Sequence, residues 1–450
     1  MSLTADTIAA LATPAGTSAL ALLRISGGLC PTLVTAIFGH DPLPRTSRHA
    51  DYRDRRGGLV DDVVFTYFPG PHSFTGEDIL EISCHGNPFI ARKILTDLLD
   101  RGCRMAEPGE FSQRAFLNGR MELSQAEAIM DLIHARSERA LAAAQQQLRG
   151  ALGRKMDGLI ETLLKLLAQV EAYIDFPEED LPSQDQNRLL EALTALQAGT
   201  SRLLATSHYG ALLRDGIKTV IIGEPNAGKS SLLNQLVGHE RALVSPEPGT
   251  TRDYLEEGIS IGAHWLRLID TAGLNLVPGP LEQRGIEKTR EQAAIADLFL
   301  WVIDASRPLP LLPSGFSQWM TPANTIVVYN KNDLPPAEHT PLPRPFSSVS
   351  ISAMTGQGLD ALEAALNRIA ESYQTSEGDD LIAINVRHAQ ALDQARACLE
   401  SARSKLSDNI CNELLASDLR DCLTAFGQIS GKIDNERMLD QLFATFCIGK

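Results

Sequence analysis

The segment GEPNAGKS at residues 223–230 constrains this chain more than any other stretch, because it matches the pattern G-x-x-x-x-G-K-[ST]. The β-branched run at 217–222 predicts a buried strand before it, and residues 231–236 begin a helix after it. Glycines at both ends of the loop let backbone N–H groups approach phosphate oxygens, and the helix N-terminus adds partial positive charge. Lys229 is expected to reach the β- and γ-phosphates, and Ser230 to bind Mg²⁺. This order of strand, loop and helix predicts a nucleotide phosphate site.

Further segments of a nucleotide site follow in chain order. Residues 249–253 supply a switch-type threonine, with Thr251 as a second Mg²⁺ ligand. Asp270 follows the strand-like run 265–269, where its carboxylate can organise Mg²⁺, and the Gly273 amide can sense the γ-phosphate. Each segment alone is compatible with a strand followed by a turn, but their order favours a GTPase.

The base is predicted to be guanine. In the segment 330–333, NKND, Asp333 can accept hydrogen bonds from the N1 and exocyclic amino groups of guanine, which adenine cannot provide. The segment 350–353, SISA, supplies the loop under the base. The expected nucleotide contacts are Asn226, Ala227, Gly228, Lys229, Ser230, Ser231, Ser245, Pro246, Glu247, Pro248, Gly249, Thr250, Thr251, Asp270, Thr271, Ala272, Gly273, Asn330, Lys331, Asp333, Ser352 and Ala353.

The bulk properties of the chain limit the remaining possibilities. A length of 450 residues allows two to four domains. The formal charge of −15 argues against a protein that coats nucleic acid by general phosphate attraction, so any RNA contact is expected to be local or shared with a partner. The seven cysteines form no C-x-x-C pair, which favours buried packing residues over disulfides or zinc. No apolar run reaches the length of a membrane span, and a cytoplasmic location is expected.

Residues 1–119 predict one α/β domain. Strand-like runs lie at 19–25, 62–67 and 78–82, and a helix is expected after residues 85–88. Arg24 and Glu81 interrupt apolar runs, either because they line a pocket or because they face solvent; position alone favours solvent. The segment 73–78 is interpreted as a loop with an N-cap-like turn.

Helix-forming sequence dominates 120–215 and 374–450, on either side of the predicted GTPase domain at 216–373. A capping-box-like start is expected at Ser124. Apolar stripes at helical spacing predict bundle packing; their members are Leu159, Leu163, Leu167, Val170, Leu415, Leu419, Leu423, Phe426 and Ile429. The acidic segment 177–182 is interpreted as a solvated loop and not a metal site. One discontinuous helical domain with an inserted GTPase domain explains both helical blocks.

Several short motifs give the whole chain a resemblance to a known family. They are ATP at 12–14, LRISG at 23–27, FTGED at 74–78, PGEFS at 108–112, RAFLN at 114–118, QAEA at 125–128 and FCIGK at 446–450. With the GTPase segments, these motifs resemble the MnmE (TrmE) family of tRNA-modification GTPases. The resemblance implies an N-terminal tetrahydrofolate-binding and dimerisation domain, a helical domain and an inserted Ras-like P-loop GTPase domain.

The resemblance also implies site residues. Arg24, Glu81, Arg120 and Lys450 match positions that hold 5-formyltetrahydrofolate or another tetrahydrofolate one-carbon derivative, and Cys447 matches a terminal cysteine whose thiol is a candidate in the chemistry. The sequence alone slightly favours a buried Cys447 thiol in a frayed tail, and the last three residues argue against a prenyl anchor. Glu282 matches the carboxylate that positions the attacking water. The implied K⁺ ligands, which would replace an arginine finger, are Asn226, Ser245, Glu247 and Thr250.

The activity implied by the resemblance is GTP hydrolysis activated by K⁺-dependent GTPase-domain dimerisation and coupled to tRNA modification. A homodimer would join an FAD-dependent MnmG-type partner in a heterotetramer or larger assembly. Together they would add a carboxymethylaminomethyl or aminomethyl group to C5 of the wobble uridine of certain tRNAs. Two alternatives stay open: a regulatory GTPase switch in ribosome assembly or stress, and a folate-dependent transferase that needs no flavin protein.

Overall fold

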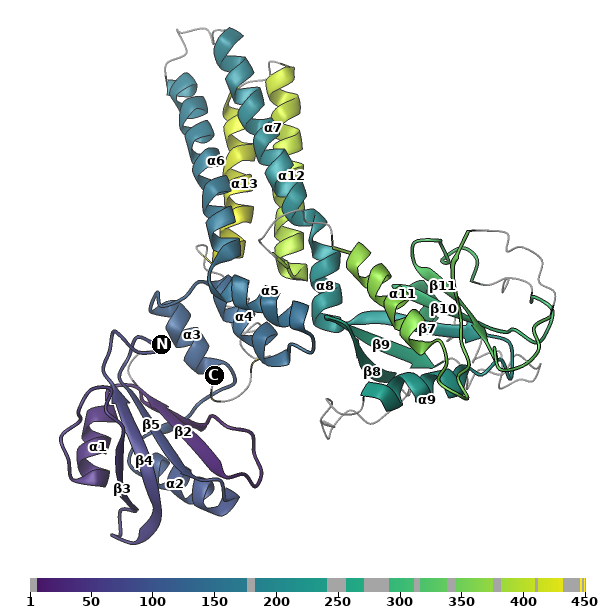
Figure 1. The fold of residues 1–450 in the computed structure, drawn as a ribbon. Helices are drawn as coiled ribbons and strands as arrows, with labels where there is room; N and C mark the ends of the chain where they lie inside the picture. Colours follow the sequence, from purple (N-terminus) through teal and green to yellow (C-terminus); the bar gives the residue numbers. More distant parts are fainter. Residues whose placement is uncertain are drawn as a thin grey trace, which may run out of the picture. The chain divides into compact units, whose positions relative to one another are not determined.

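The computed structural model describes residues 6–175, 183–240, 256–270, 291–310, 316–337, 345–374, 382–408, 412–431, 446 and 449. The chain forms two compact units. The first comprises Met1–Met130, Gly153–Met156 and Phe426–Lys450, and the second comprises Asp131–Leu152 and Asp157–Ala425. Each unit contains its own six-stranded sheet (Figure 1).

The sheet of the first unit has the strand order β3-β4-β5-β2-β1-β6. Its elements are β1 (Ile8–Leu11), β2 (Leu20–Ser26), α1 (Cys30–Phe38), β3 (Arg48–Arg53), β4 (Leu59–Phe68), β5 (Ile79–His85), α2 (Pro88–Asp100) and β6 (Arg104–Met105). Buried and less buried residues alternate along β2, so one face packs against α1 and α2 in a common apolar core. The three predicted strands and the predicted helix are confirmed.

The opposite face of this sheet carries a small second core and the charged residues Arg24 and Glu81. Ile8 and Ala10 of β1 pack there with Phe111 of α3 (Glu110–Leu117). Arg24 on β2 and Glu81 on β5 face each other in the antiparallel register. Cross-strand neighbours of opposite charge stabilise each other, so the pair is part of the sheet's construction and not simple solvent-facing alternation.

The second unit contains a mostly parallel sheet with the order β12-β11-β10-β7-β9-β8. Its strands are β7 (Ile217–Gly223), β8 (Glu256–Ile261), β9 (His264–Asp270), β10 (Leu298–Asp304), β11 (Thr325–Asn330) and β12 (Ser347–Ser350). Among the described strands of this second sheet, β8 pairs with β9 in the antiparallel direction and the other pairs are parallel. All residues of β10 are buried, as expected for a central parallel strand with both faces covered.

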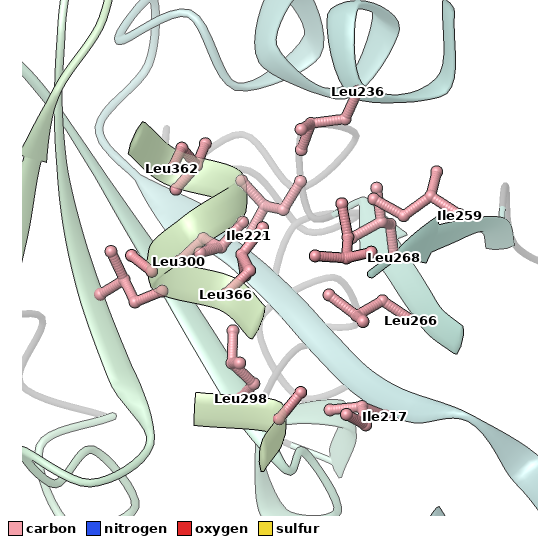
Figure 2. Packing of buried hydrophobic residues seen from close by; sticks show 14 of the residues in the cluster. Ile217, Ile221, Leu236, Ile259, Leu266, Leu268, Leu298, Leu300, Leu362 and Leu366 are labelled. Atoms are coloured by element: carbon pink, nitrogen blue, oxygen red, sulfur yellow. The ribbon is translucent and has the colours of Figure 1, made fainter. Parts of the chain in front are cut away.

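Two helices of this unit share one core with the sheet. Figure 2 shows Leu236 of α9 (Lys229–Glu240) and Leu362 and Leu366 of α11 (Leu359–Ser372) with apolar residues from β7, β8, β9 and β10. The strand at 217–222 and the helix after 230 are predictions that the structure confirms.

Two shorter helices extend the same core beyond the sheet. Ala140 and Ala143 of α5 (Glu138–Leu148) and Tyr209 and Leu212 of α8 (Ser207–Asp215) belong to the cluster that contains Ile221 and Leu300. Helices α5 and α8 therefore pack with the sheet of the second unit, although the sequence predicts a helical domain for residues 120–215.

Four long helices stand side by side in Figure 1: α6 (Ala151–Asp175), α7 (Ser183–Ala205), α12 (Val386–Ser407) and α13 (Asn412–Ser430). Arg420 of α13 bonds Glu171 of α6 at 2.9 Å, and Gln186 of α7 donates to the carbonyl of Leu406 at 3.1 Å. The predicted apolar stripes are buried at Leu163, Leu167, Val170, Leu415, Leu419, Phe426 and Ile429. Bundle packing is therefore confirmed.

One helix start was predicted wrongly. Helix α4 spans Leu123–His134, so Ser124 lies inside its first turn and does not precede it. The Ser124 hydroxyl is buried without a hydrogen-bond partner, and a capping box on this residue is not formed. The acidic segment 177–182 lies outside the described residues. Within the described part of the chain, none of the helices could span a membrane.

Candidate nucleotide and one-carbon sites

The phosphate loop connects β7 to α9, and its backbone has the conformation that its glycines predict. Gly223 has φ +155° and Gly228 φ +94°, which side chains disfavour. Asn226 adopts a left-handed φ of +64°, a conformation that Asn tolerates better than most residues. The ammonium of Lys229 lies over the loop, where it donates to the carbonyls of Gly223 (3.0 Å) and Glu224 (2.9 Å). Ser230 and Ser231 are exposed in the first turn of α9, where they can contact phosphate and a hydrated Mg²⁺.

Asn330 ties the phosphate loop to the loop after β12. Its side-chain amide donates to the carbonyl of Ala227 at 2.8 Å, and its side-chain oxygen accepts from the Ala353 N–H at 2.9 Å. The residue is 2% exposed, so both neutral hydrogen bonds are shielded from water. A Cβ on Gly228 would lie 2.1 Å from the Asn330 amide nitrogen, so the loop can approach this closely only with glycine.

Ser352 fixes the position of Asp333, the residue predicted to recognise the base. The Ser352 hydroxyl, which is fully buried, donates to Oδ1 of Asp333 at 2.6 Å and accepts from the Thr355 N–H at 3.2 Å. Asp333 borders a cavity of about 540 Å³, whose lining residues are Gly228, Ser231, Asn234, Gln235, Asn330, Lys331, Asp333, Leu334, Ala353 and Met354. The cavity thus brings together part of the predicted set, namely Gly228, Ser231, Asn330, Lys331, Asp333 and Ala353; its lining does not include Asn226, Ala227, Lys229, Ser230 or Ser352.

Several predicted nucleotide and metal residues lie outside the described residues. They are Ser245, Pro246, Glu247, Pro248, Gly249, Thr250, Thr251, Thr271, Ala272, Gly273 and Glu282. Asp270 ends β9 and pairs in parallel register with Ile221, which puts its backbone beside the strand that leads into the phosphate loop. Carboxylate and hydroxyl oxygens are donors of the kind that Mg²⁺ prefers, and the roles of Asp270 and Ser230 at Mg²⁺ stay predictions.

One residue near the cavity was missed by the sequence analysis. Asp304 ends β10 and bonds the ammonium of Lys331 at 2.7 Å. A carboxylate directly after a buried apolar strand is the same signal that identified Asp270. The strand LFLWVID at 298–304 could have revealed it.

In the first unit, Arg24 has three kinds of partner. Its Nε and Nη2 donate to the same oxygen of Glu81 at 2.9 and 2.8 Å, and its Nη1 donates to the Gly449 carbonyl at 3.4 Å. Its guanidinium carbon lies 5.3 Å from the ring centre of Phe74 and 5.9 Å from that of Phe111, within the range of cation–π attraction. The Arg24 and Glu81 side chains are 17% and 25% exposed, so a ligand could reach both.

Gly449 explains how the C-terminal tail can approach this pair. It has φ +96°, and an added Cβ would lie 2.8 Å from both the Leu11 carbonyl oxygen and the Ala12 Cα. At position 449 only glycine therefore lets the tail approach the end of β1 this closely without displacement of the backbone. Cys447 and Lys450 lie outside the described residues.

Arg120 contacts the loop that carries Phe74, because its Nε donates to the Ser73 carbonyl at 3.2 Å. The predicted loop at 73–78 is confirmed, although it leads into β5 and caps no helix. Three of the four predicted folate residues are therefore described, and two of them, Arg24 and Glu81, are in direct contact.

An ionic network with Arg114 buried at its centre supports the same loop. Arg114, with a side chain 2% exposed, bonds Asp6 at 2.7 Å, Glu110 at 2.9 Å and Glu77 at 3.1 Å. Arg104 bonds Asp6 at 2.7 Å and Glu110 at 2.6 Å. Burial opposes ionisation of Asp6 and Glu110, but hydrogen bonds from the two arginines outweigh it and lower the pKa of both carboxyls. The network thus consists of charged groups in mutual contact.

Glu77 connects this network to the loop. Its Oε2 accepts from the Ser26 hydroxyl at 2.8 Å, and Ser26 also contacts the Thr75 hydroxyl at 2.7 Å. Sequence motifs contained Glu77, Glu110 and Arg114, but no pattern indicated that they meet.

The described cysteines behave as packing residues. Cys30, Cys84, Cys103 and Cys422 are buried, and burial raises the pKa of Cys84 and Cys103 to about 11. Among the described residues, no three His, Cys, Asp or Glu side chains gather into a metal-binding group.

Comparisons with known proteins agree along nearly the whole length. Residues 7–120 match the family described as "GTP-binding protein TrmE N-terminus", and residues 123–447 match "MnmE helical domain". A "tRNA modification GTPase MnmE" of Opitutus terrae is 57% identical over 99% of both chains. Proteins with the same description from Akkermansia muciniphila and Symbiobacterium thermophilum are 43% and 41% identical, again over 99% of both chains.

Proposed function

Because this chain belongs to the MnmE family of tRNA modification GTPases, we propose that its GTP hydrolysis drives modification of C5 of the wobble uridine in certain tRNAs. The group added is carboxymethylaminomethyl or aminomethyl, and its carbon comes from a tetrahydrofolate derivative such as 5-formyltetrahydrofolate. A homodimer acts with an FAD-dependent MnmG-type protein in a heterotetramer or larger complex. The reaction takes place in the cytoplasm, where tRNA is matured.

The guanine cavity is the observation that supports the GTPase half of the proposal. Asn330 and Ser352 hold the phosphate loop, the base-recognition carboxylate and the loop under the base in one hydrogen-bonded arrangement. Lys229 binds the β- and γ-phosphates once it exchanges its loop carbonyls for phosphate oxygens. Mg²⁺, held by Ser230, Thr251 and the organising carboxylate of Asp270, would neutralise developing charge on the phosphates. Glu282 orients the attacking water.

The K⁺ dependence is a separate part of the proposal. Asn226 is exposed in the phosphate loop, and its left-handed backbone presents a side-chain oxygen of the kind that K⁺ accepts as a ligand. Ser245, Glu247 and Thr250 complete the proposed ligand set, and K⁺ would add positive charge between the phosphates. The two GTPase domains of the homodimer would close on each other when GTP and K⁺ are bound.

The pair Arg24–Glu81 supports the one-carbon half of the proposal. Glu81 uses one oxygen for Arg24, so its other oxygen can accept from pterin N–H groups. Phe74 supplies flat apolar surface beside the pair, and the fully buried Phe111 packs behind it against the Arg24 guanidinium. Arg120 and Lys450 bind the carboxylates of the folate. On this proposal residues 1–119 bind folate and dimerise, 120–215 and 374–450 form the helical domain, and 216–373 form the GTPase domain; Cys447 belongs to the one-carbon site.

Nucleoside mass spectrometry of tRNA tests the proposal directly. A strain that lacks this chain is expected to lose the modified wobble uridine, and the wild-type gene is expected to restore it. An unchanged wobble uridine would reject the modification function in favour of a regulatory GTPase. The modification should also disappear when the MnmG-type protein is removed. Its persistence there would indicate a folate-dependent transferase that works alone.

Complementation with point variants tests the nucleotide site and the one-carbon site separately. Arg24→Leu should leave GTP turnover intact and abolish the modification, whereas Asp333→Asn should abolish both. GTP turnover in KCl and in NaCl at equal ionic strength tests the ion site, because much faster turnover is expected in KCl. Equal rates would reject K⁺ activation without affecting the other proposals.

A further inference from the structure

Asp304 lies at the edge of the sheet where the nucleotide residues gather. It ends the fully buried strand β10 and pairs in parallel register with Asn330, the residue that precedes Lys331. The carboxyl ends of parallel strands meet at the same edge, so β10 brings Asp304 to the side of the phosphate loop. Its exposed fraction is only 8%, which is unusual for a carboxylate without a structural or functional role.

Both oxygens of this carboxylate are engaged. Oδ1 accepts from the Ser306 N–H at 3.0 Å and from the Ser306 hydroxyl at 2.6 Å. Oδ2 accepts from the Lys331 ammonium at 2.7 Å. Burial opposes its ionisation, but these hydrogen bonds outweigh burial and lower the pKa of Asp304, which is therefore charged at neutral pH. Ser306 thus fixes the direction in which Asp304 meets Lys331.

Lys331 is constrained at both ends. Its backbone has a left-handed φ of +65°, which is uncommon for a residue with a long side chain, and its ammonium is bound to Asp304. The residue also borders the cavity that contains Asp333. With both ends fixed, the methylene stem of Lys331 is held in one conformation at the cavity wall. A lysine stem can cover a flat apolar surface while its charged end stays hydrogen-bonded elsewhere.

We infer that Asp304 is a positioning residue for guanine nucleotides: it holds Lys331 so that the stem forms one face of the slot for the base. Asp304 itself touches no nucleotide. Its contribution is to remove the side-chain freedom that Lys331 would otherwise lose on binding, and preorganisation of this kind raises affinity. GDP and GTP should benefit equally, because the slot does not contact the γ-phosphate.

The substitution Asp304→Asn tests the inference with little change of shape. Asn can still accept from Ser306, but it cannot form an ion pair with Lys331. The Kd for GDP and for a non-hydrolysable GTP analogue, measured by calorimetry on the full chain, should rise about tenfold, as expected for loss of a charged hydrogen bond. In turnover assays the rise should appear in KM, and kcat at saturating GTP should fall far less.

A double-mutant cycle distinguishes this role from a general structural one. Lys331→Ala alone should weaken GDP binding, and Asp304→Asn should have no further effect in that background because it acts through Lys331. Additive losses would overturn the inference, as would an unchanged Kd in the single Asp304→Asn variant.

Two further variants keep the test decisive. A second cation, Arg307, has its Nε 3.6 Å from Oδ2 of Asp304, and its side chain is 63% exposed. Arg307→Ala removes this cation and should leave the Kd unchanged. Ser306→Ala frees the direction of Asp304 without altering any charge, and should raise the Kd about threefold. If Asp304→Asn does not fold, an unchanged Kd in Ser306→Ala rejects the inference.

Discussion

The guanine cavity and the Arg24 site hold their polar groups in different ways. Around the cavity, Asn330 joins the loops by neutral hydrogen bonds, Ser352 donates to the Asp333 carboxylate, and Asp304 with Lys331 is an ion pair beside them. Around Arg24, the loop at 73–78 is held by charged groups in contact, with Arg114 at the centre. The neutral hydrogen bonds of Asn330 should be insensitive to pH, whereas the Arg114 network should depend on the ionisation of its carboxyls.

The largest expected effect concerns base recognition at the guanine cavity. Asp333→Asn replaces an acceptor with a donor that opposes guanine N1–H and its amino group, and GTP turnover at limiting substrate should fall about 10⁴-fold. Xanthosine triphosphate, whose base carries an oxygen in place of the amino group, should recover much of the rate. Turnover assays with both nucleotides measure this exchange. Loss of turnover with both would indicate that the cavity has collapsed and that its neutral bonds are weaker than proposed.

The next effect concerns the charged site. Arg114→Met should lower the free energy of unfolding of the first unit by about 3–5 kcal/mol, because three carboxylates lose a buried partner. Trp265, Trp301 and Trp319 all belong to the second unit, so tryptophan fluorescence would miss this change. Hydrogen exchange of peptides from residues 6–117 should detect it. Arg104→Met is the control, since its side chain is 41% exposed and its loss should cost less.

An acid titration sharpens the comparison further. The pKa values of Asp6 and Glu110 are lowered from 3.8 and 4.5, so their stabilising contribution is fully present above those values. It should be lost as the pH falls through 4.5 and 3.8 toward the lower values of the folded state. Glu110→Gln should be less stable at pH 7 but should show a flatter dependence between pH 5 and pH 3. Equal slopes in wild type and variant would remove the distinction between the two sites.

The smallest expected effect is at the tail. Gly449→Ala puts a Cβ against the backbone of Leu11 and Ala12, which should displace the tail from Arg24. We expect tRNA modification to fall about tenfold, the cost of about 1.4 kcal/mol of lost docking, with unchanged GTP turnover. Nucleoside analysis in a complemented strain measures it. A normal level of tRNA modification would mean that the Arg24 site works without the contact to Gly449.

Much of the nucleotide site could be predicted because its residues lie in contiguous motifs at strand ends. The phosphate loop between 217–222 and the following helix needed only local sequence. Asp304 was missed because its partner Lys331 is 27 residues away and the strand β10 was not assigned. The ionic network is harder still to predict from the sequence, since Asp6 and Arg114 are 108 residues apart and no periodicity relates them.

Two elements of the first unit were missed for local reasons. Strand β3, with the sequence RHADYR, lies at the edge of the sheet, and only Tyr52 among its residues is fully buried. Its polar sequence therefore does not indicate a strand. Helix α1 is short and has a proline in its first turn, which is favourable there but is easily taken for a loop signal.

The apolar core shared by α5, α8 and the GTPase sheet has a consequence for experiments on the isolated parts. Residues that pack in one core tend to open and close together, so these helices should be protected from exchange to the same degree as the sheet. A ligand that binds only the folded state slows every opening that destroys its site. Addition of GDP should therefore slow deuterium uptake in α5 and α8, and a GTPase fragment cut at residue 216 would lose this protection together with part of its core.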